Sequence, residues 1–103
     1  MTDRSPGPAE LLHERLSLVA RLSALNAEAL KLIQRLGAVE MEVLRIELES
    51  GRNGGSPELV RLLHEAESDA EAIRAEQARC DEDIAAVEGQ VEAIDRRLAT
   101  GND

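Results

Sequence analysis

Residues 51–57 read Gly-Arg-Asn-Gly-Gly-Ser-Pro, and turn-forming residues cluster nowhere else between residues 9 and 100. Gly51 suits the left-handed position that follows a helix end, whereas Ser56 before Pro57 is typical of an N-cap with proline at the first helical position. A signal that ends a helix therefore stands directly before a signal that begins one. The sequence predicts that the chain breaks here between two helices.

The segments on both sides of this break have the composition of long helices. The first contains no proline between residues 9 and 50 and is dominated by Leu, Ala, Glu and Arg, which are good helix formers. The second continues to about Thr100, where Gly101 can cap it. The sequence predicts a single helical-hairpin domain at 8–100 with these parts: a helix at 8–50, a hinge at 51–57 and a helix at 57–100. We expect a flexible lead at 1–7 and a flexible tail at 101–103.

Apolar residues recur in alternating steps of four and three along both segments, which is the heptad spacing of a coiled coil. The inner stripe of the first helix comprises Leu18, Leu22, Leu25, Ala29, Leu32, Leu36, Val39, Val43 and Ile46. The inner stripe of the second comprises Leu59, Leu63, Ala66, Ala70, Ile73, Gln77, Cys80, Ile84, Val87, Val91, Ile94 and Leu98. Its one polar member, Gln77, is expected to set register or specificity. The sequence therefore predicts an all-α fold, two long helices forming an antiparallel coiled-coil hairpin.

The pairing register of the hairpin follows from the position of the turn. Folding at Gly54 and Gly55 pairs residues whose numbers sum to 109, and inner-stripe residues then meet one another. Arg15 lies opposite Ile94 in this register and can extend its charge outward. A shift of one heptad, to a sum of 102, also preserves the stripes but places the turn near Gly51. The glycine pair favours the sum of 109.

The first helix carries further apolar residues outside its inner stripe, whereas the second helix carries mainly acids there and is expected to face water. An exposed apolar patch of several hundred Å² typically marks an interaction site. The residues of this expected interface, called the apolar face, are Leu12, Leu16, Val19, Asn26, Leu30, Ile33, Met41, Leu44 and Leu48. Asn26 with Ser23 could form a shared polar layer that fixes register near residue 28 of an antiparallel dimer. The alternative is that both side chains simply face water.

Composition narrows the classes of partner. The 103 residues include 12 Lys and Arg, 21 Asp and Glu, and no aromatic residue, which gives a net charge of -9. Nucleic-acid binding depends on phosphate neutralisation and, for single strands, on aromatic stacking, so we expect no nucleic-acid partner. No apolar run approaches the ~20 residues of a membrane helix, and the start MTDRSPGPAE lacks the features of a signal peptide. We therefore expect no membrane contact and a cytoplasmic location.

Few residues have the spacing of a chemical site. Glu10 and His13 match the i, i+3 pattern of di-iron bundles, but the residues expected opposite His13 are cationic, so we expect no metal. Cys80 stands in the inner stripe and is expected to pack as a small apolar residue. Four acids at alternating positions scatter around the second helix and suggest a solvated face: Glu65, Glu67, Asp69 and Glu71. We predict a protein that is not an enzyme and uses no cofactor.

Self-association covers the apolar face most simply, with two hairpins packing first helix to first helix as a four-helix bundle. The leading hypothesis is a non-enzymatic coiled-coil interaction module, an adaptor, assembly or regulatory factor, that acts as a homodimer and binds another protein. The architecture resembles that of prefoldin-type and export chaperones, which implies an alternative: a small holder that binds an amphipathic client segment on the first helix. A third hypothesis is an acidic inhibitor that imitates nucleic acid in a basic groove.

Overall fold

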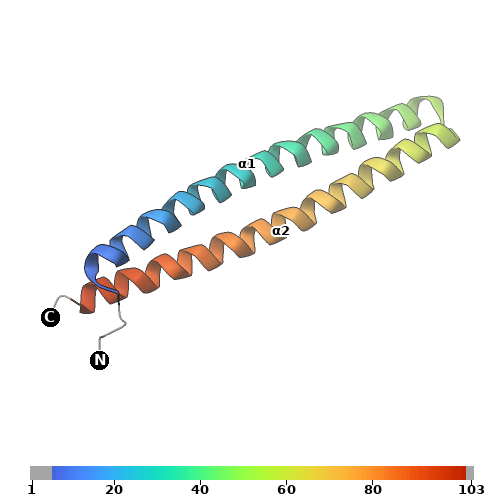
Figure 1. Ribbon diagram of the computed structural model, residues 1–103. Helices are drawn as coiled ribbons and strands as arrows, with labels where there is room; N and C mark the ends of the chain where they lie inside the picture. Colours follow the sequence, from blue (N-terminus) through green and yellow to red (C-terminus); the bar gives the residue numbers. More distant parts are fainter. Residues whose placement is uncertain (1–5, 102–103) are drawn as a thin grey trace. The chain divides into compact units, whose positions relative to one another are not determined.

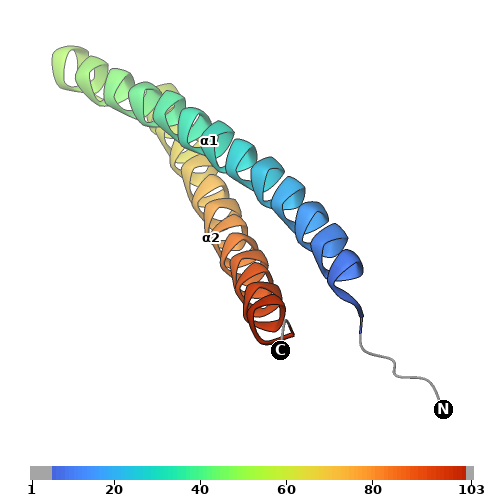
Figure 2. The same ribbon diagram turned by 90° about the vertical axis from the view of Figure 1, so that its left-hand side faces the viewer.

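The computed structural model describes residues 6–101, which form two helices and no strand. Helix α1 spans Pro8–Asn53 and helix α2 spans Pro57–Thr100. Figure 1 and Figure 2 show both as uninterrupted helices joined by a short connection. The two helices pack as a hairpin, so the predicted all-α hairpin is confirmed.

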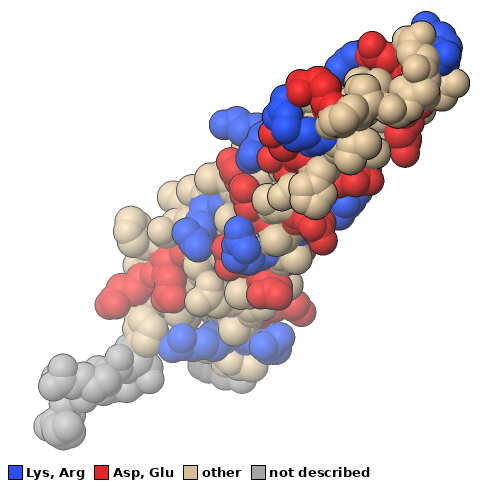
Figure 3. Space-filling view, turned by 90° about the vertical axis from the view of Figure 1, so that its right-hand side faces the viewer, with Lys and Arg blue, Asp and Glu red and all other residues tan. Residues whose placement is uncertain are grey.

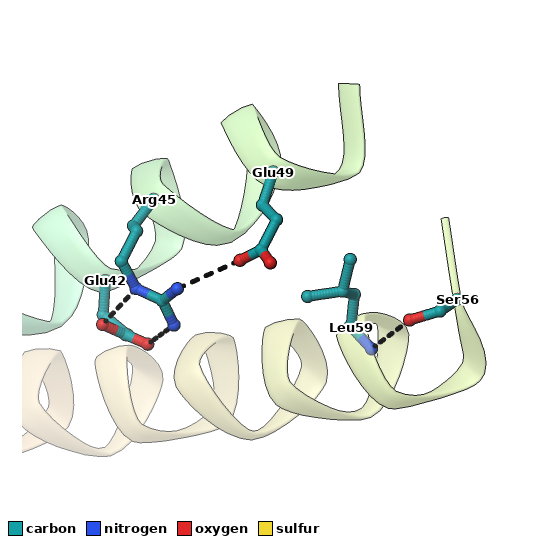
Figure 4. A network of polar contacts seen from close by, with 5 residues as sticks. All are labelled: Glu42, Arg45, Glu49, Ser56 and Leu59. Carbon is teal, nitrogen blue, oxygen red and sulfur yellow. Dashed lines mark hydrogen bonds and ion pairs between the residues drawn. The ribbon is translucent and has the colours of Figure 1, made fainter. Parts of the chain in front are cut away.

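The start of α2 has the predicted capping geometry. The Oγ atom of Ser56 accepts a hydrogen bond from the backbone N–H of Leu59 at 3.1 Å (Figure 4). The carbonyl oxygen of Ser56 accepts the N–H of Val60 at 3.0 Å, which closes the first helical turn. Pro57 occupies the first helical position, where its missing N–H would have no partner within the helix. Ser56 is therefore the N-cap of α2, as the sequence predicts.

The end of α1 lies three residues later than the sequence analysis places it. Gly51 is helical, and α1 continues to Asn53. Gly54, with φ of 77°, is the one residue with positive φ in the described chain. The hinge prediction of 51–57 is wrong in this respect, because Gly54 rather than Gly51 provides the left-handed conformation that ends the helix.

At the other end of the hairpin the predicted helix limits hold. The N–H of Leu11 donates to the carbonyl of Gly7 at 3.0 Å as α1 begins. The N–H of Gly101 donates to the carbonyl of Arg97 at 2.8 Å after α2 ends at Thr100. The expected flexible lead and tail fall largely on residues 1–5 and 102–103, which lie outside the described residues.

The chain groups into two compact units, and each pairs a segment of α1 with a segment of α2. Unit 1 contains residues up to Ala27 and from Asp81 onward, and unit 2 contains Glu28–Cys80. The single domain predicted for 8–100 stays a prediction.

Each unit has its own apolar core built from the two inner stripes. In unit 1 the buried side chains are Val87 and Ile94 of the α2 stripe and Leu11, which lies seven residues before the first member of the α1 stripe. In unit 2 they are Leu32, Ile46, Ala66, Ala70, Ile73 and Cys80. The remaining inner-stripe residues, including Gln77, are half-buried. Every residue of the two predicted stripes is thus at least half-buried, and burial of this apolar surface is the main force that holds the helices together.

Three ion pairs between the helices report the register. In unit 1 the Nε of Arg15 donates to Oδ1 of Asp95 at 2.6 Å, and Asp95 is the neighbour of the predicted opposite residue, Ile94. In unit 2 the Arg35–Glu76 pair has a separation of 3.4 Å and the Glu40–Arg74 pair 3.3 Å. In the register with a sum of 102, Arg15 would lie about 12 Å along α2 from Asp95. The contacts agree with the sum of 109.

Shortening a core side chain tests the packing. Leu32 is 1% exposed, so Leu32→Ala should lower the free energy of unfolding by about 2–5 kcal/mol through lost burial and a residual cavity. Leu32→Met is the matched control and should cost less than about 1.5 kcal/mol. Urea unfolding followed by circular dichroism measures both. An alanine variant within about 0.5 kcal/mol of the parent would show that this stripe is not the core.

Two glycine substitutions test the corrected helix end. Gly51→Ala should stabilise the protein by about 0.5–1 kcal/mol, because Gly51 is helical and an added Cβ meets no atom within 4 Å. Gly54→Ala should destabilise it by about 1–2 kcal/mol, because φ at this residue is positive. Thermal unfolding of the two variants gives the signs. The opposite pair of signs would place the end of α1 at Gly51.

The Arg15–Asp95 ion pair predicts a pH-dependent stability. The hydrogen bond from Arg15 holds the pKa of Asp95 below its ordinary value of 3.8. Because the folded pKa is lowered, the pair stabilises the fold above about pH 4, and this stabilisation is lost as the pH falls through the lowered pKa. Asp95→Asn should therefore reduce the Tm by a few degrees at pH 7 and by progressively less as the pH falls below 3.8, the ordinary pKa of the carboxyl.

A matched control removes an acid that makes no contact with α1. Glu92 lies 4.0 Å from Arg96 on the same helix, so Glu92→Gln should change the Tm less than Asp95→Asn at pH 7. Equal Tm values for Asp95→Asn and the parent at pH 7 would contradict a contribution of this pair to the hairpin.

Candidate interaction surface

The largest group of exposed apolar side chains lies on α1 in unit 2. The members, here called the unit-2 apolar face, are Leu30, Ile33, Met41, Leu44 and Leu48. Their exposed fractions range from 48% to 66%. At 100° of rotation per residue they fall within roughly 80° of the helix circumference. Five large side chains that share one narrow arc form a continuous apolar strip rather than scattered exposed residues.

Unit 1 carries a smaller group of the same kind on α1. Leu12 and Leu16 are 57% and 68% exposed, and Val19 is 39% exposed. Asn26 is exposed as well. All nine residues of the predicted apolar face are therefore at the surface of the hairpin, and the expectation that they serve an interface stays a prediction.

The hairpin leaves these residues uncovered for a geometric reason. The centre of the unit-2 apolar face lies roughly 130° around α1 from the centre of the inner stripe of that unit. A single neighbouring helix covers one stripe, and α2 already packs on the inner one. The chain has no third helix among its described residues. Nothing within the hairpin can cover this side of α1.

Helix α2 has a different outer surface. Its one strongly exposed large apolar residue within the described chain is Val60, at 63%. The four acids that the sequence analysis places on a solvated face are all exposed: Glu65, Glu67, Asp69 and Glu71. Figure 3 shows acidic and basic side chains interspersed on the surface it displays. The apolar surplus of the hairpin is thus concentrated on α1.

One charged residue at each edge of the unit-2 apolar face is already paired within the chain. On one edge Glu40 pairs with Arg74 of α2 at 3.3 Å. On the other edge Arg45 donates hydrogen bonds to Glu42 and to Glu49 of its own helix (Figure 4). The hydrogen bond from Arg45 lowers the pKa of the Glu42 carboxyl. A partner that covered the strip would therefore leave neither edge charge without its counter-ion.

The two residues assigned to register have different environments. Asn26 is exposed on α1 in unit 1, beside the exposed Ser23. Gln77 is half-buried on α2 in unit 2, next to Glu76, which pairs with Arg35. These positions are compatible with a role in register, which stays a prediction for both residues.

The residues considered for chemistry are not brought together. His13 and Glu10 are exposed in unit 1, and His64 is exposed in unit 2. Cys80 is buried in the core. Within residues 6–101 no polar or charged side chain is buried, and no group of three His, Cys, Asp or Glu could hold a metal ion. Neither helix has, over the described residues, the length of apolar sequence needed to cross a bilayer.

No protein-family model matches the chain, and neither curated proteins nor solved structures give a match.

One exposed apolar residue, Val60, is not identified from the sequence because it is a single apolar residue outside the inner stripe of α2. The spacing along the first helix already places Gly37 on the apolar face, seven residues from both Leu30 and Leu44.

Proposed function

We propose that the protein is a non-enzymatic protein–protein interaction module that works as a homodimer. Two antiparallel coiled-coil hairpins pack α1 against α1 to form a four-helix bundle. The bundle acts in the cytoplasm as an adaptor, assembly or regulatory factor. The observation that carries this proposal is the strip of apolar side chains on α1, exposed by 48–66%, which the hairpin itself cannot cover.

The coiled-coil part of the proposal rests on the spacing of burial. Inner-stripe residues recur in steps of four and three on both helices, and all are at least half-buried. That spacing lets side chains of one helix fit between those of the other. On the apolar face the steps from Leu30 to Ile33, Gly37, Met41 and Leu44 are three, four, four and three residues. These are the step lengths of the inner stripe, although here they do not strictly alternate. A second helix can therefore pack there by the same geometry.

A second copy is the simplest occupant because every copy carries the same uncovered strip and two-fold dimers are the commonest assemblies. In such a dimer the outer surface belongs mainly to α2. Residues 51–103 contain 13 acids and 6 basic residues, a net charge of -7. The surface presented to a further protein is therefore acidic, and it favours a partner with a basic surface.

The alternative function is a chaperone-like holder that binds an amphipathic client segment on α1. The same exposed strip supports it, and Met41 adds a flexible side chain that adapts to different clients. The two functions differ in the state of the pure protein. A monomer that binds hydrophobic dyes favours the holder, whereas a stable dimer favours the self-associating module.

Placing a charge on the strip tests the proposed dimer. Ile33 is 59% exposed in the hairpin, so Ile33→Glu leaves the core of each chain intact. In the dimer it would bury a carboxylate with no basic partner nearby. We expect Ile33→Glu to sediment as a monomer, with reduced helicity because the strip is left in water.

Two control variants separate an interface effect from a general effect of charge. Ser17→Glu adds the same charge to an exposed position of α1 that is not part of the strip, and Asp81→Lys changes the exposed surface of α2. Both should sediment as the parent does, and Asp81→Lys should weaken binding only to a basic partner, in a salt-dependent manner. An Ile33→Glu protein that sediments as the parent assembly would exclude the dimer and favour a client groove.

A further inference from the structure

A glycine lies at the centre of the unit-2 apolar face. Gly37 follows Leu30 by seven residues and precedes Leu44 by seven, so the three lie nearly on one line along α1. Ile33 and Met41 flank it at four residues on either side. Four large apolar side chains thus surround a position that has no side chain.

The hairpin itself gives no reason for glycine at this position. Gly37 is in the middle of α1 with an ordinary helical backbone, since positive φ occurs only at Gly54 within the described chain. A Cβ atom at Gly37 would meet no atom within 4 Å. Glycine inside a helix is less stable than alanine, so the hairpin alone would be more stable with alanine there.

The surroundings of Gly37 are self-complementary under reversal of the helix direction. Turning α1 about this residue exchanges Leu30 with Leu44 and Ile33 with Met41. An antiparallel copy would therefore place leucine against leucine and isoleucine against methionine. A two-fold interface requires this kind of self-matching of one patch.

We propose that the unit-2 apolar face binds the same face of a second copy, antiparallel, with the two-fold axis beside Gly37. This inference rests on the proposed homodimer and adds its register. The missing side chain lets the two α1 backbones approach closely at the crossing point, because the distance between packed helices depends on the side chains at the contact. The four flanking side chains of each copy then close around the crossing.

Area and charge both fit a second copy as the occupant. The strip offers several hundred Å² of apolar surface, so two copies would bury about 1,000 Å², the lower range of specific interfaces. In an antiparallel two-fold pair the edge with Glu40 in one copy lies on the same side as the edge with Glu40 in the other, and the two glutamates are about 9 Å apart along the helices. Each Glu40 keeps its own ion pair with Arg74 at 3.3 Å. Neither glutamate is therefore an unpaired charge at this edge.

This register differs from the one centred near residue 28, in which Asn26 and Ser23 would form a shared polar layer. There, Asn26 of one copy would lie opposite Leu30 of the other. Centring on Gly37 instead places Leu30 opposite Leu44. Pairs of cysteine substitutions distinguish these two arrangements directly.

Disulfide formation at the crossing point tests the register. Gly37→Cys should form a dimer linked between the two residues at position 37 under mild oxidation, because a disulfide needs Cα atoms within about 7 Å. Mixing Leu30→Cys with Leu44→Cys should give the mixed dimer faster than either variant alone. Peptide mapping separates these products from any that involve Cys80, which is buried.

The matched control is Ala38→Cys, an exposed neighbour that points about 100° away around α1. If the protein is a dimer but Gly37→Cys links no faster than Ala38→Cys, or Leu30→Cys links preferentially with Asn26→Cys, the register is overturned and the proposed function stands. If the unmodified protein is a monomer, both are overturned.

A substitution that places a large side chain at position 37 provides an independent readout. Gly37→Leu enlarges the exposed apolar surface of a single hairpin. If the hairpins associated only through non-specific hydrophobic contact, this variant would associate more strongly than the parent. At a close crossing it would instead separate the backbones and raise the dimer dissociation constant at least about tenfold. Far-ultraviolet circular dichroism should show unchanged or higher helicity at concentrations where both proteins are dimeric. Stronger association of Gly37→Leu than of the parent would overturn the proposal.

Discussion

The structure depends on the burial of one apolar stripe from each helix against the other. Without aromatic residues, the chain has only Leu, Ile, Val, Ala and similar small side chains for a core. Such side chains bury enough surface only when they repeat at regular intervals along a long contact. This is why the protein consists of two helices of 46 and 44 residues rather than a more compact arrangement of short elements.

The same geometry explains why the two helices have different outer surfaces. Each helix of a pair can bury one stripe, and any further apolar stripe stays in water. Helix α2 carries mainly acids and other polar residues outside its stripe, whereas α1 carries the strip from Leu30 to Leu48. At the edges of this strip Glu40 forms an ion pair with Arg74, and Arg45 forms ion pairs with Glu42 and Glu49. The strip is therefore apolar and has edge charges that are paired within the chain, which are properties of a surface that another helix covers.

Much of the fold could be predicted because it depends on local rules of spacing. Steps of four and three identify the buried stripes, and Ser56 before Pro57 identifies the start of α2. The end of α1 was misplaced by three residues because both Gly51 and Gly54 can adopt a left-handed conformation. The choice between them depends on where the two stripes must meet, which is a tertiary constraint.

The candidate site was less predictable than the fold. Spacing along α1 locates the apolar residues, and their exposure in the structure agrees with that analysis. The pairing of Arg15 with Asp95, and of Glu40 with Arg74, depends on side-chain reach across the two helices. The role proposed for Gly37 follows only when the empty space at its Cβ position is combined with the symmetry of its neighbours.

The measurement that tests the central claim most directly is sedimentation equilibrium of the unmodified protein between about 1 and 100 μM, a range in which micromolar or tighter association is visible. If the strip on α1 binds a second copy, the fitted mass should be twice the 11.2 kDa of one chain at the higher concentrations. A mass of 11.2 kDa throughout that range would contradict the account, because the strip would then remain uncovered in the pure protein.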